Sequence, residues 1–122
     1  NAQRRQNAGY PSRHLAGMPA VTPPIVREEA THVFHQYTVS LTDRARTIDA
    51  LTEQGIGYGI YYPIPIHKQE VYLSRGYDVT LPVTEAASER VLSLPVHPAL
   101  SEADLAQIVG AIRAAAHAPV AV

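Results

Sequence analysis

The stretch HVFHQYTVSL, residues 32–41, decides the fold class of this 122-residue chain. Apolar and aromatic residues alternate along it with mostly polar residues such as Gln36 and Ser40. The mostly apolar side would carry Val33, His35, Tyr37, Val39 and Leu41. A period of two with β-branched and aromatic residues is typical of a strand that buries one face. We therefore expect a strand here, packed on a core through that face.

The residues after this strand predict a helix and then a second strand. Thr42 or Asp43 can cap the helix, and Gly55 stands where a left-handed C-terminal residue belongs. The apolar positions of the helix are Ala45, Ile48 and Leu51. Beyond it, GYGIYY at 57–62 predicts a strand that Pro63 ends.

Further along the chain, turn signals and helical periods alternate. PIPIH at 63–67 is a stiff extended loop, and a short helix is predicted over about 69–74. A longer helix is expected from Thr84 to about Leu92, followed by extended chain over 93–96. The inward side of that longer helix would carry Ala86, Ala87, Val91 and Leu92.

The last helix has the clearest helical period in the chain. Ser101 opens it, and Asp104 three residues later makes a pattern close to a capping box. Its apolar positions are Leu105, Ile108, Val109, Ile112 and Ala116. Together these elements predict an α+β fold, in which a short and mostly antiparallel sheet is covered by helices.

The N-terminal segment is predicted to be less regular. Ala8 and Leu15 lie on one helical face, but Pro11 interrupts the pattern, so we expect a frayed or broken helix over residues 1–15. The prolines of GMPAVTPP at 17–24 favour an extended linker.

These patterns divide the chain into three parts. Residues 1–24 are predicted to be a helix remnant and linker, and residues 25–117 a single domain. Residues 118–122 (PVAV and the preceding Ala) are predicted to be a disordered tail. One domain is what a chain of this length can form.

Composition excludes several classes of protein. Hydrophobic residues make up 46% and charged residues 17%, which argues against disorder. No apolar run is long enough to span a membrane, and a net charge of -1 disfavours binding to nucleic acid. The absence of cysteine removes disulfides and thiolate chemistry. No secretory leader is recognised, so a cytoplasmic location is expected.

Six histidines invite a metal hypothesis, which their spacing does not support. His32 and His35 form an HxxH pair, and residues three apart on a strand point to opposite faces. We therefore predict no metal site, and expect His35 to be a half-buried histidine hydrogen-bonded inside the sheet.

The densest polar chemistry lies in YYPIPIHKQ, residues 61–69. Two prolines one residue apart fix the backbone and reduce the ordering entropy lost on binding. Around them stand the phenols of Tyr61 and Tyr62, the imidazole of His67 and the ammonium of Lys68. From spacing alone, two interpretations remain open: a rigid loop that positions a substrate, or an ordinary proline-rich connector.

Three stretches of the sequence resemble one known family. HVFHQYTVSL, GIGYGIYYPIPIHKQ at 55–69 and LPVTEAASERVLSLPVHPALSEADLAQIV at 81–109 resemble the C-terminal part of the DegT/DnrJ/StrS sugar aminotransferases. The resemblance covers roughly residues 4–116, and YYPIPIHKQ and LSLPVHP are its most specific motifs. It implies the small C-terminal domain of the aspartate-aminotransferase fold type.

The resemblance also implies a larger enzyme. In this family an N-terminal domain carries the lysine and the other main ligands of pyridoxal phosphate, and the enzymes are commonly homodimers. They transfer an amino group from an amino-acid donor, usually glutamate, to a nucleotide-linked keto-sugar or a cyclitol. Lys68, the one lysine here, matches a variable position of the family's YPIPxHxQ pattern, so it is not expected to be the cofactor lysine. Tyr61 stands where many relatives have histidine.

We therefore expect this chain to be inactive alone, with no catalytic residue, and to contribute substrate contacts to a complete transaminase. The expected substrate-binding residues are Tyr61, Tyr62, His67 and Lys68. Two alternatives stay open: a non-catalytic binding or regulatory module, and a sugar dehydratase that uses the aminated cofactor.

Overall fold

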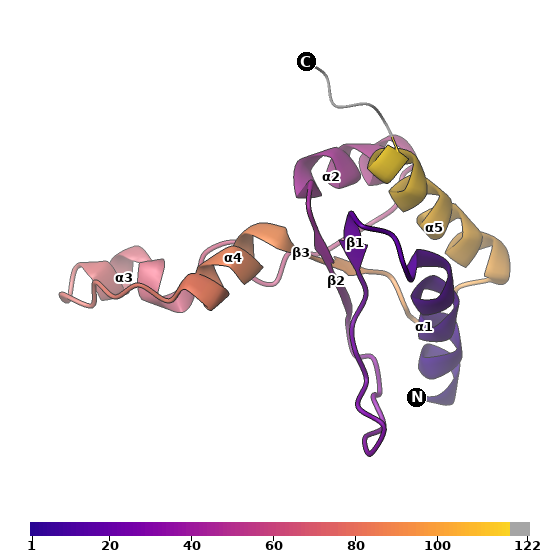
Figure 1. Cartoon of the computed structure of the whole chain (residues 1–122), viewed down its shortest axis with the longest axis horizontal. Coiled ribbons are helices and arrows are strands. Elements are labelled where there is room, and N and C mark those ends of the chain that lie inside the picture. Colours follow the sequence, from indigo (N-terminus) through magenta and orange to yellow (C-terminus); the bar gives the residue numbers. More distant parts are fainter. Residues whose placement is uncertain (118–122) are drawn as a thin grey trace.

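The computed structural model describes residues 1–117, which form a layered body and an arm. The body consists of a small sheet and the helices that pack around it, and the arm leaves the sheet on one side (Figure 1). The α+β fold predicted from the sequence is confirmed. The predicted disordered tail at 118–122 lies outside the described residues.

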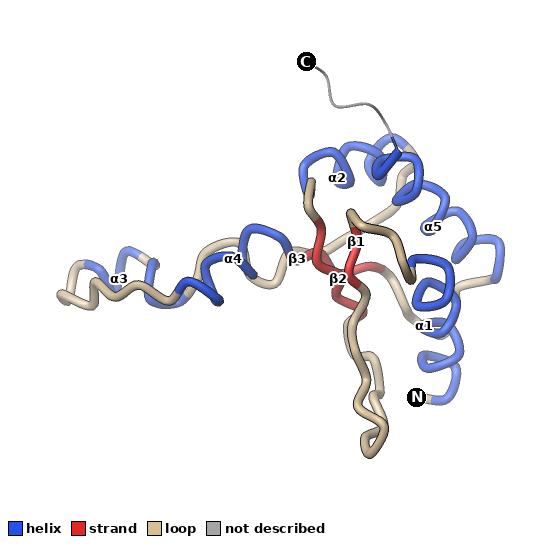
Figure 2. The backbone as a smooth tube through the Cα atoms, viewed as in Figure 1, coloured by secondary structure: helices blue, strands red, loops and turns tan. Residues whose placement is uncertain are grey.

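The sheet has three antiparallel strands in the order β1-β2-β3 (Figure 2). These are β1 (Val21–Thr22), β2 (Tyr37–Leu41) and β3 (Val91–Leu94). The central strand β2 alternates as predicted, since Tyr37, Val39 and Leu41 are buried and the residues between them are half-buried. Burial raises the pKa of the Tyr37 phenol, although its hydrogen bond to Ser12 opposes this.

The central strand is shorter than the predicted strand at 32–41. Phe34 has a left-handed φ of 47° and a buried ring, so the alternation breaks before the strand begins. As a result Val33 and His35 are exposed instead of facing the core. The expectation that His35 is hydrogen-bonded inside the sheet is therefore wrong.

Helix α2 (Arg44–Glu53) begins and ends where the sequence predicts. The Asp43 carboxylate accepts a hydrogen bond from the Arg46 amide at 3.0 Å, which caps the N-terminus. Gly55, with φ 67°, ends the helix, and the Ile56 amide donates to the Leu51 carbonyl at 2.9 Å. Of the predicted inward set Leu51 is fully buried and Ile48 half-buried, but Ala45 is exposed and Thr47 is buried instead.

Helix α5 (Glu102–His117) carries the predicted capping box. The Ser101 amide and hydroxyl donate to the Asp104 carboxylate at 2.8 and 2.6 Å, and the Asp104 amide donates back to Ser101 Oγ at 3.2 Å. These bonds from Ser101 lower the pKa of Asp104. The buried face of α5 contains Leu105, Ile108, Val109, Ala111, Ile112 and Ala115, whereas Ala116, which was predicted to face inward, is half-buried.

Helix α1 (Ala2–Leu15) is continuous, so the prediction of a frayed or broken helix is wrong. Pro11 lies inside it, and a proline there normally costs about 3 kcal/mol. Burial of Ala8 and Leu15 in the core offsets this cost. Residues 1–24 thus supply one helix and one strand to the body.

The core lies between the sheet and the helices of the body. Its largest fully buried side chains come from α1, β2, α2, β3 and α5, and they are Tyr37, Leu15, Leu51, Leu92, Ile112 and Val39. Helix α5 packs against both α1 and α2 and so connects the helices that surround the sheet. Among residues 1–117, no helix is long and apolar enough to cross a membrane.

The arm, residues 62–90, is built from short helices and has little core of its own. It contains the 3₁₀ turn η1 (Ile66–Lys68), the short helix α3 (Glu70–Leu73) and α4 (Pro82–Arg90). Within the arm only His67 and Ser88 are buried. The predicted inward residues Ala86 and Ala87 are therefore exposed, because α4 stands off the body and has no sheet face to cover.

The second predicted strand, at 57–62, is not formed. Its contact with the sheet is a single bridge, in which Gly59 and Ser93 exchange backbone hydrogen bonds of 3.0 and 2.7 Å. Beyond this bridge the chain leaves the sheet for the arm. The longer predicted helix at 84–92 also shifts: it begins at Pro82 and ends at Arg90, so that Val91 and Leu92 belong to β3.

Candidate functional site

Tyr61 and Tyr62 lie at the root of the arm, just after the bridge between Gly59 and Ser93. The Tyr61 ring lies over the backbone of Gly59, and a Cβ at Gly59 would come within 2.5 Å of it. The Tyr61 and Tyr62 rings meet edge to face, with centroids 5.7 Å apart. Tyr61 is 48% exposed and Tyr62 73%, so both phenols can reach a ligand.

Both tyrosines line a groove of about 420 Å³ between the 61–69 loop and α4. On the loop side stand Tyr61, Tyr62 and Ile64, and on the α4 side Thr84, Ala87 and Ser88. Its walls are mainly apolar, with hydroxyl and amide groups at a few points. A groove of this kind suits a ligand that combines a ring with a few hydrogen-bonding groups.

His67, predicted to contact a substrate, is buried and bonded within the arm. Its Nε2 lies 2.9 Å from Oε1 of Glu85, and the same carboxylate oxygen accepts the Leu81 amide at 2.9 Å. The hydrogen bond from His67 is the main reason that the pKa of Glu85 is lowered, with the Leu81 amide second. His67 thus joins the proline-rich loop to the start of α4.

Lys68 is held by carboxylates. Its Nζ lies 3.6 Å from Oδ1 of Asp78 and 3.9 Å from Oε1 of Glu85. The side chain is 34% exposed, so each pair contributes modestly. The structure therefore separates the four predicted site residues: Tyr61 and Tyr62 face the groove, while His67 and Lys68 converge on Glu85.

Three residues of the site were not identified from the sequence. The Glu85 carboxylate forms a hydrogen bond with His67, an ion pair with Lys68 and a hydrogen bond with the Leu81 amide. Gly59 leaves space for the Tyr61 ring. The buried Ser88 hydroxyl donates to the Glu85 carbonyl at 2.7 Å. An acidic residue in the first turn of a helix is a recognisable signal, and it marks Glu85. Gly59 is one of the alternating glycines of GIGYG, which permit a close approach to the backbone, but the pattern does not identify the Tyr61 ring as the group that approaches.

Comparison with known proteins links this geometry to one family. Residues 1–113 match the model of the DegT/DnrJ/EryC1/StrS aminotransferase family. The chain is similar to a UDP-N-acetyl-3-dehydro-α-D-glucosamine 3-aminotransferase of Acidithiobacillus ferrooxidans, with 40% identity over 117 residues. That alignment covers 96% of this chain and 31% of the relative.

Two further comparisons, one of sequence and one of structure, match most of the chain to proteins with different names. A pleiotropic regulatory protein of Geobacillus stearothermophilus is 43% identical over 104 residues, which are 82% of this chain and 28% of the relative. The crystal structure of S. venezuelae DesV with a ketimine intermediate superposes with a TM-score of 0.87 at 27% identity. It covers 98% of this chain and 33% of the other. The chain thus spans about a third of the length of the relatives it matches.

Proposed function

The chain belongs to the DegT/DnrJ/EryC1/StrS aminotransferase family, and from this premise we propose that it is the small C-terminal domain of a sugar aminotransferase. The enzyme would move an amino group from an amino acid to a nucleotide-linked keto-sugar or a cyclitol, in the cytoplasm. The observation that carries the proposal is the family match over residues 1–113, supported by 40% identity to an aminotransferase that acts on a UDP-linked sugar.

The described residues do not fit a pyridoxal-phosphate site by themselves. A lysine that binds this cofactor must be free to act as a nucleophile. Lys68, the one lysine in the sequence, lies beside the carboxylates of Asp78 and Glu85. The proposal therefore assigns the cofactor to an N-terminal domain, and no chemical step to this chain. In the same proposal residues 1–24, which supply α1 and β1 to the body, also connect it to the N-terminal domain.

The exposed apolar surface of the arm supports the proposal that this chain binds partner domains. Tyr62, Val79 and Val83 are 73%, 47% and 83% exposed, although each is apolar or aromatic. A monomeric domain rarely leaves so much contiguous apolar surface uncovered. We propose that the N-terminal cofactor domain and the second subunit of a homodimer cover the arm in the complete enzyme.

Within that enzyme the groove of Tyr61 and Tyr62 would face the sugar substrate. Each phenol can donate and accept a hydrogen bond, which suits sugar hydroxyls. His67 would act beside them by holding Glu85, and thus the wall formed by α4, in place. Lys68 would supply positive charge near an anionic nucleotide, balanced by its two carboxylates.

A second function has one observation in its favour. The relative from Geobacillus stearothermophilus, 43% identical over 104 residues, is named a pleiotropic regulatory protein. A chain with this fold and without the cofactor domain would be a binding module. A cofactor lysine replaced by histidine in the complete protein would instead favour a sugar dehydratase.

The test is to purify the complete product of the reading frame that contains this chain. We expect it to bind pyridoxal phosphate and to form 2-oxoglutarate from glutamate when a UDP-linked 3-keto-sugar is supplied, measured by mass spectrometry. The same assay without the keto-sugar is the control. A product that neither binds the cofactor nor consumes glutamate would support the regulatory module instead.

A further inference from the structure

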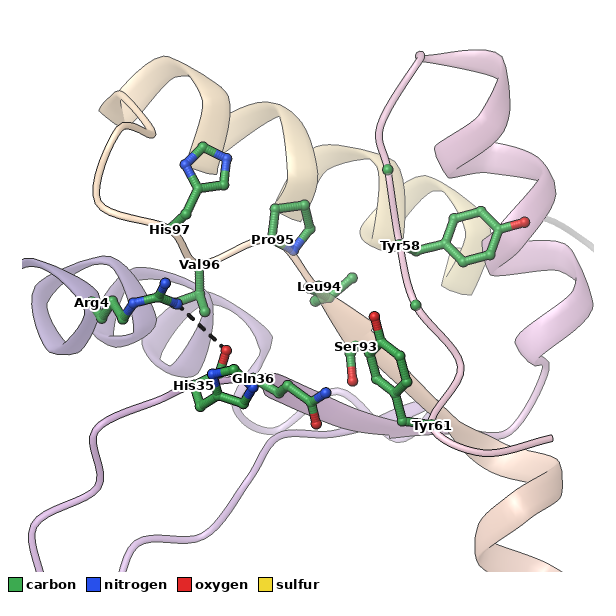
Figure 3. A pocket seen from close by; sticks show the side chains of 12 residues that line it. Arg4, His35, Gln36, Tyr58, Tyr61, Ser93, Leu94, Pro95, Val96 and His97 are labelled. Carbon is green, nitrogen blue, oxygen red and sulfur yellow. Dashed lines mark hydrogen bonds between the residues drawn. The ribbon is translucent and has the colours of Figure 1, made fainter. Parts of the chain in front are cut away.

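A second cavity, of about 380 Å³, lies on the body between the start of α1 and the end of the sheet. Arg4, His35 and His97 stand at one end of it, and Tyr61 and Ser93 at the other (Figure 3). The residues that line it include a guanidinium, two imidazoles and two phenols, and none of them is Asp or Glu. The cavity therefore has a positive end that its own walls do not neutralise.

The Arg4 guanidinium is fixed at that end and retains unused donors. Its Nη1 donates to the carbonyls of Phe34 and His35, both at 3.4 Å. Neither Nη2 nor Nε has a hydrogen-bond partner among residues 1–117. Figure 3 shows the group between Val96 and the His35 carbonyl. Because arginine stays charged at any ordinary pH and its side chain is half-buried here, this cation is held ready for an anion.

The two histidines add donors from two other segments of the chain. His35 precedes β2 and His97 follows β3, and neither ring has a hydrogen-bond partner among residues 1–117. An imidazole has an N–H donor in both its neutral and its charged form. The Asp104 carboxylate interacts electrostatically with His97, but it is already bonded to the amide and hydroxyl of Ser101.

We propose that this cavity binds the phosphate group of a small phosphorylated molecule. Donors from three chain segments match a tetrahedral phosphate, whose terminal oxygens point in different directions, better than a planar carboxylate. The volume exceeds that of a phosphate ion, so an organic part can lie toward Tyr61 and Leu94. This cavity shares the Tyr61 ring with the groove beside α4, but Arg4, His35 and His97 do not line that groove. The inference does not depend on the aminotransferase assignment.

The experiment is a titration of the protein with inorganic phosphate and, separately, with glucose 1-phosphate, at constant ionic strength. Ring signals of the histidines, followed by NMR, report where the anion binds. We expect saturable shifts for His35 and His97 and none for His14 and His117, which do not line the cavity. Arg4→Gln should weaken binding about tenfold or more, because it removes a charged donor.

Arg5→Gln is the matched control, since Arg5 is exposed on the same helix and outside the cavity lining. It should change the affinity less than about twofold. Equal losses in the two variants, or shifts that do not saturate, would overturn the proposal. Tighter binding of glucose 1-phosphate identifies a phosphate ester as the ligand, and equal affinity identifies the free ion. If Arg4→Gln unfolds, His97→Ala replaces it under the same criteria, because that side chain is exposed.

Discussion

The Tyr61 ring occupies the space that a side chain at Gly59 would need. A Cβ built on Gly59 lies 2.5 Å from Cε2 and 2.7 Å from the hydroxyl oxygen of Tyr61. The same phenol forms part of the wall of both cavities, one on the body and one beside α4. The position of one ring therefore helps to shape both cavities, and a glycine two residues earlier allows that position.

Gly59→Ala should displace the Tyr61 ring while the fold survives. The new methyl group would overlap a half-exposed ring that can rotate away, so the free energy of unfolding should change by less than about 1 kcal/mol. NMR contacts between the Tyr61 and Tyr62 rings, whose centroids lie 5.7 Å apart, should change. Gly57→Ala is the control, because a Cβ there meets nothing within 4 Å. Unchanged Tyr61 contacts in Gly59→Ala would contradict this account.

Arg44 on α2 should determine how firmly the arm is attached to the body. Its Nη1 donates to the carbonyls of Ser88 and Val91, where α4 passes into β3. Arg44→Met keeps the aliphatic part of the side chain and removes these bonds. A hydrogen bond with a charged group typically contributes about 1.5–3 kcal/mol to stability. Amide hydrogen exchange in α4 should accelerate about tenfold or more, with little change in α5.

Arg90→Met is the control for charge, since Arg90 is exposed in the last turn of α4. It should leave exchange in α4 nearly unchanged. Equal acceleration throughout α4 and α5 in Arg44→Met would show general destabilisation of the body and would contradict an anchoring role.

The arm also shows where prediction from the sequence stops. The strand at Tyr37, the cap at Asp43 and the box at Ser101 were predicted correctly, because each depends on residues within a few positions of one another. Periodicity at Ala86 and Ala87 suggested a buried face, but both are exposed, because α4 stands off the body and Ala87 lines an open groove instead of packing on the sheet.

The candidate site follows the same division. Tyr61 and Tyr62, predicted from the sequence to bind substrate, are exposed and line the groove, and their contact with a substrate stays a prediction. The sequence did not predict that His67 turns inward, because its partner Glu85 lies 18 residues away and the pair forms only when the arm folds back. Local motifs carry no information about such a pairing.

Acid should loosen the arm through Glu85. The pKa of Glu85 is lowered in the folded chain, chiefly by the hydrogen bond from His67. Between this lowered pKa and the ordinary glutamate pKa of the unfolded chain, the folded state therefore binds fewer protons than the unfolded state. The stabilisation is therefore present above the ordinary glutamate pKa and is lost as pH falls through the lowered one. Glu85→Gln should be less stable than the parent chain near neutral pH, and the difference should shrink toward pH 3.

Thermal unfolding followed by circular dichroism, from pH 7 to pH 3, measures this difference. Glu89→Gln is the matched control, since it removes an exposed carboxylate from the same helix. A constant difference between parent and Glu85→Gln across the whole pH range would show that the charge of Glu85 does not matter.

The substrate role of the groove predicts an asymmetry between the two halves of the proposed reaction. In the complete enzyme, Tyr61→Phe should lower kcat/KM for the keto-sugar while leaving the half-reaction with glutamate near its original rate. Loss of one neutral hydrogen bond corresponds to roughly a two- to tenfold decrease. Stopped-flow absorbance of the cofactor measures each half-reaction separately. Tyr77→Phe is the control, because Tyr77 is an exposed arm tyrosine that does not line the groove.

His67→Ala separates the substrate role of this loop from its structural role. If His67 contacts the sugar, the variant should lose kcat/KM for the sugar by roughly ten- to a hundredfold. If it acts only through Glu85, Glu85→Ala should reproduce the loss, because both substitutions remove a partner of the same 2.9 Å hydrogen bond. Equal effects therefore assign His67 to positioning α4, whereas a larger effect of His67→Ala assigns it to the substrate. Normal rates in Tyr61→Phe and His67→Ala alike would show that the loop is a connector, since neither the phenol at its root nor the imidazole at its turn would then affect the sugar.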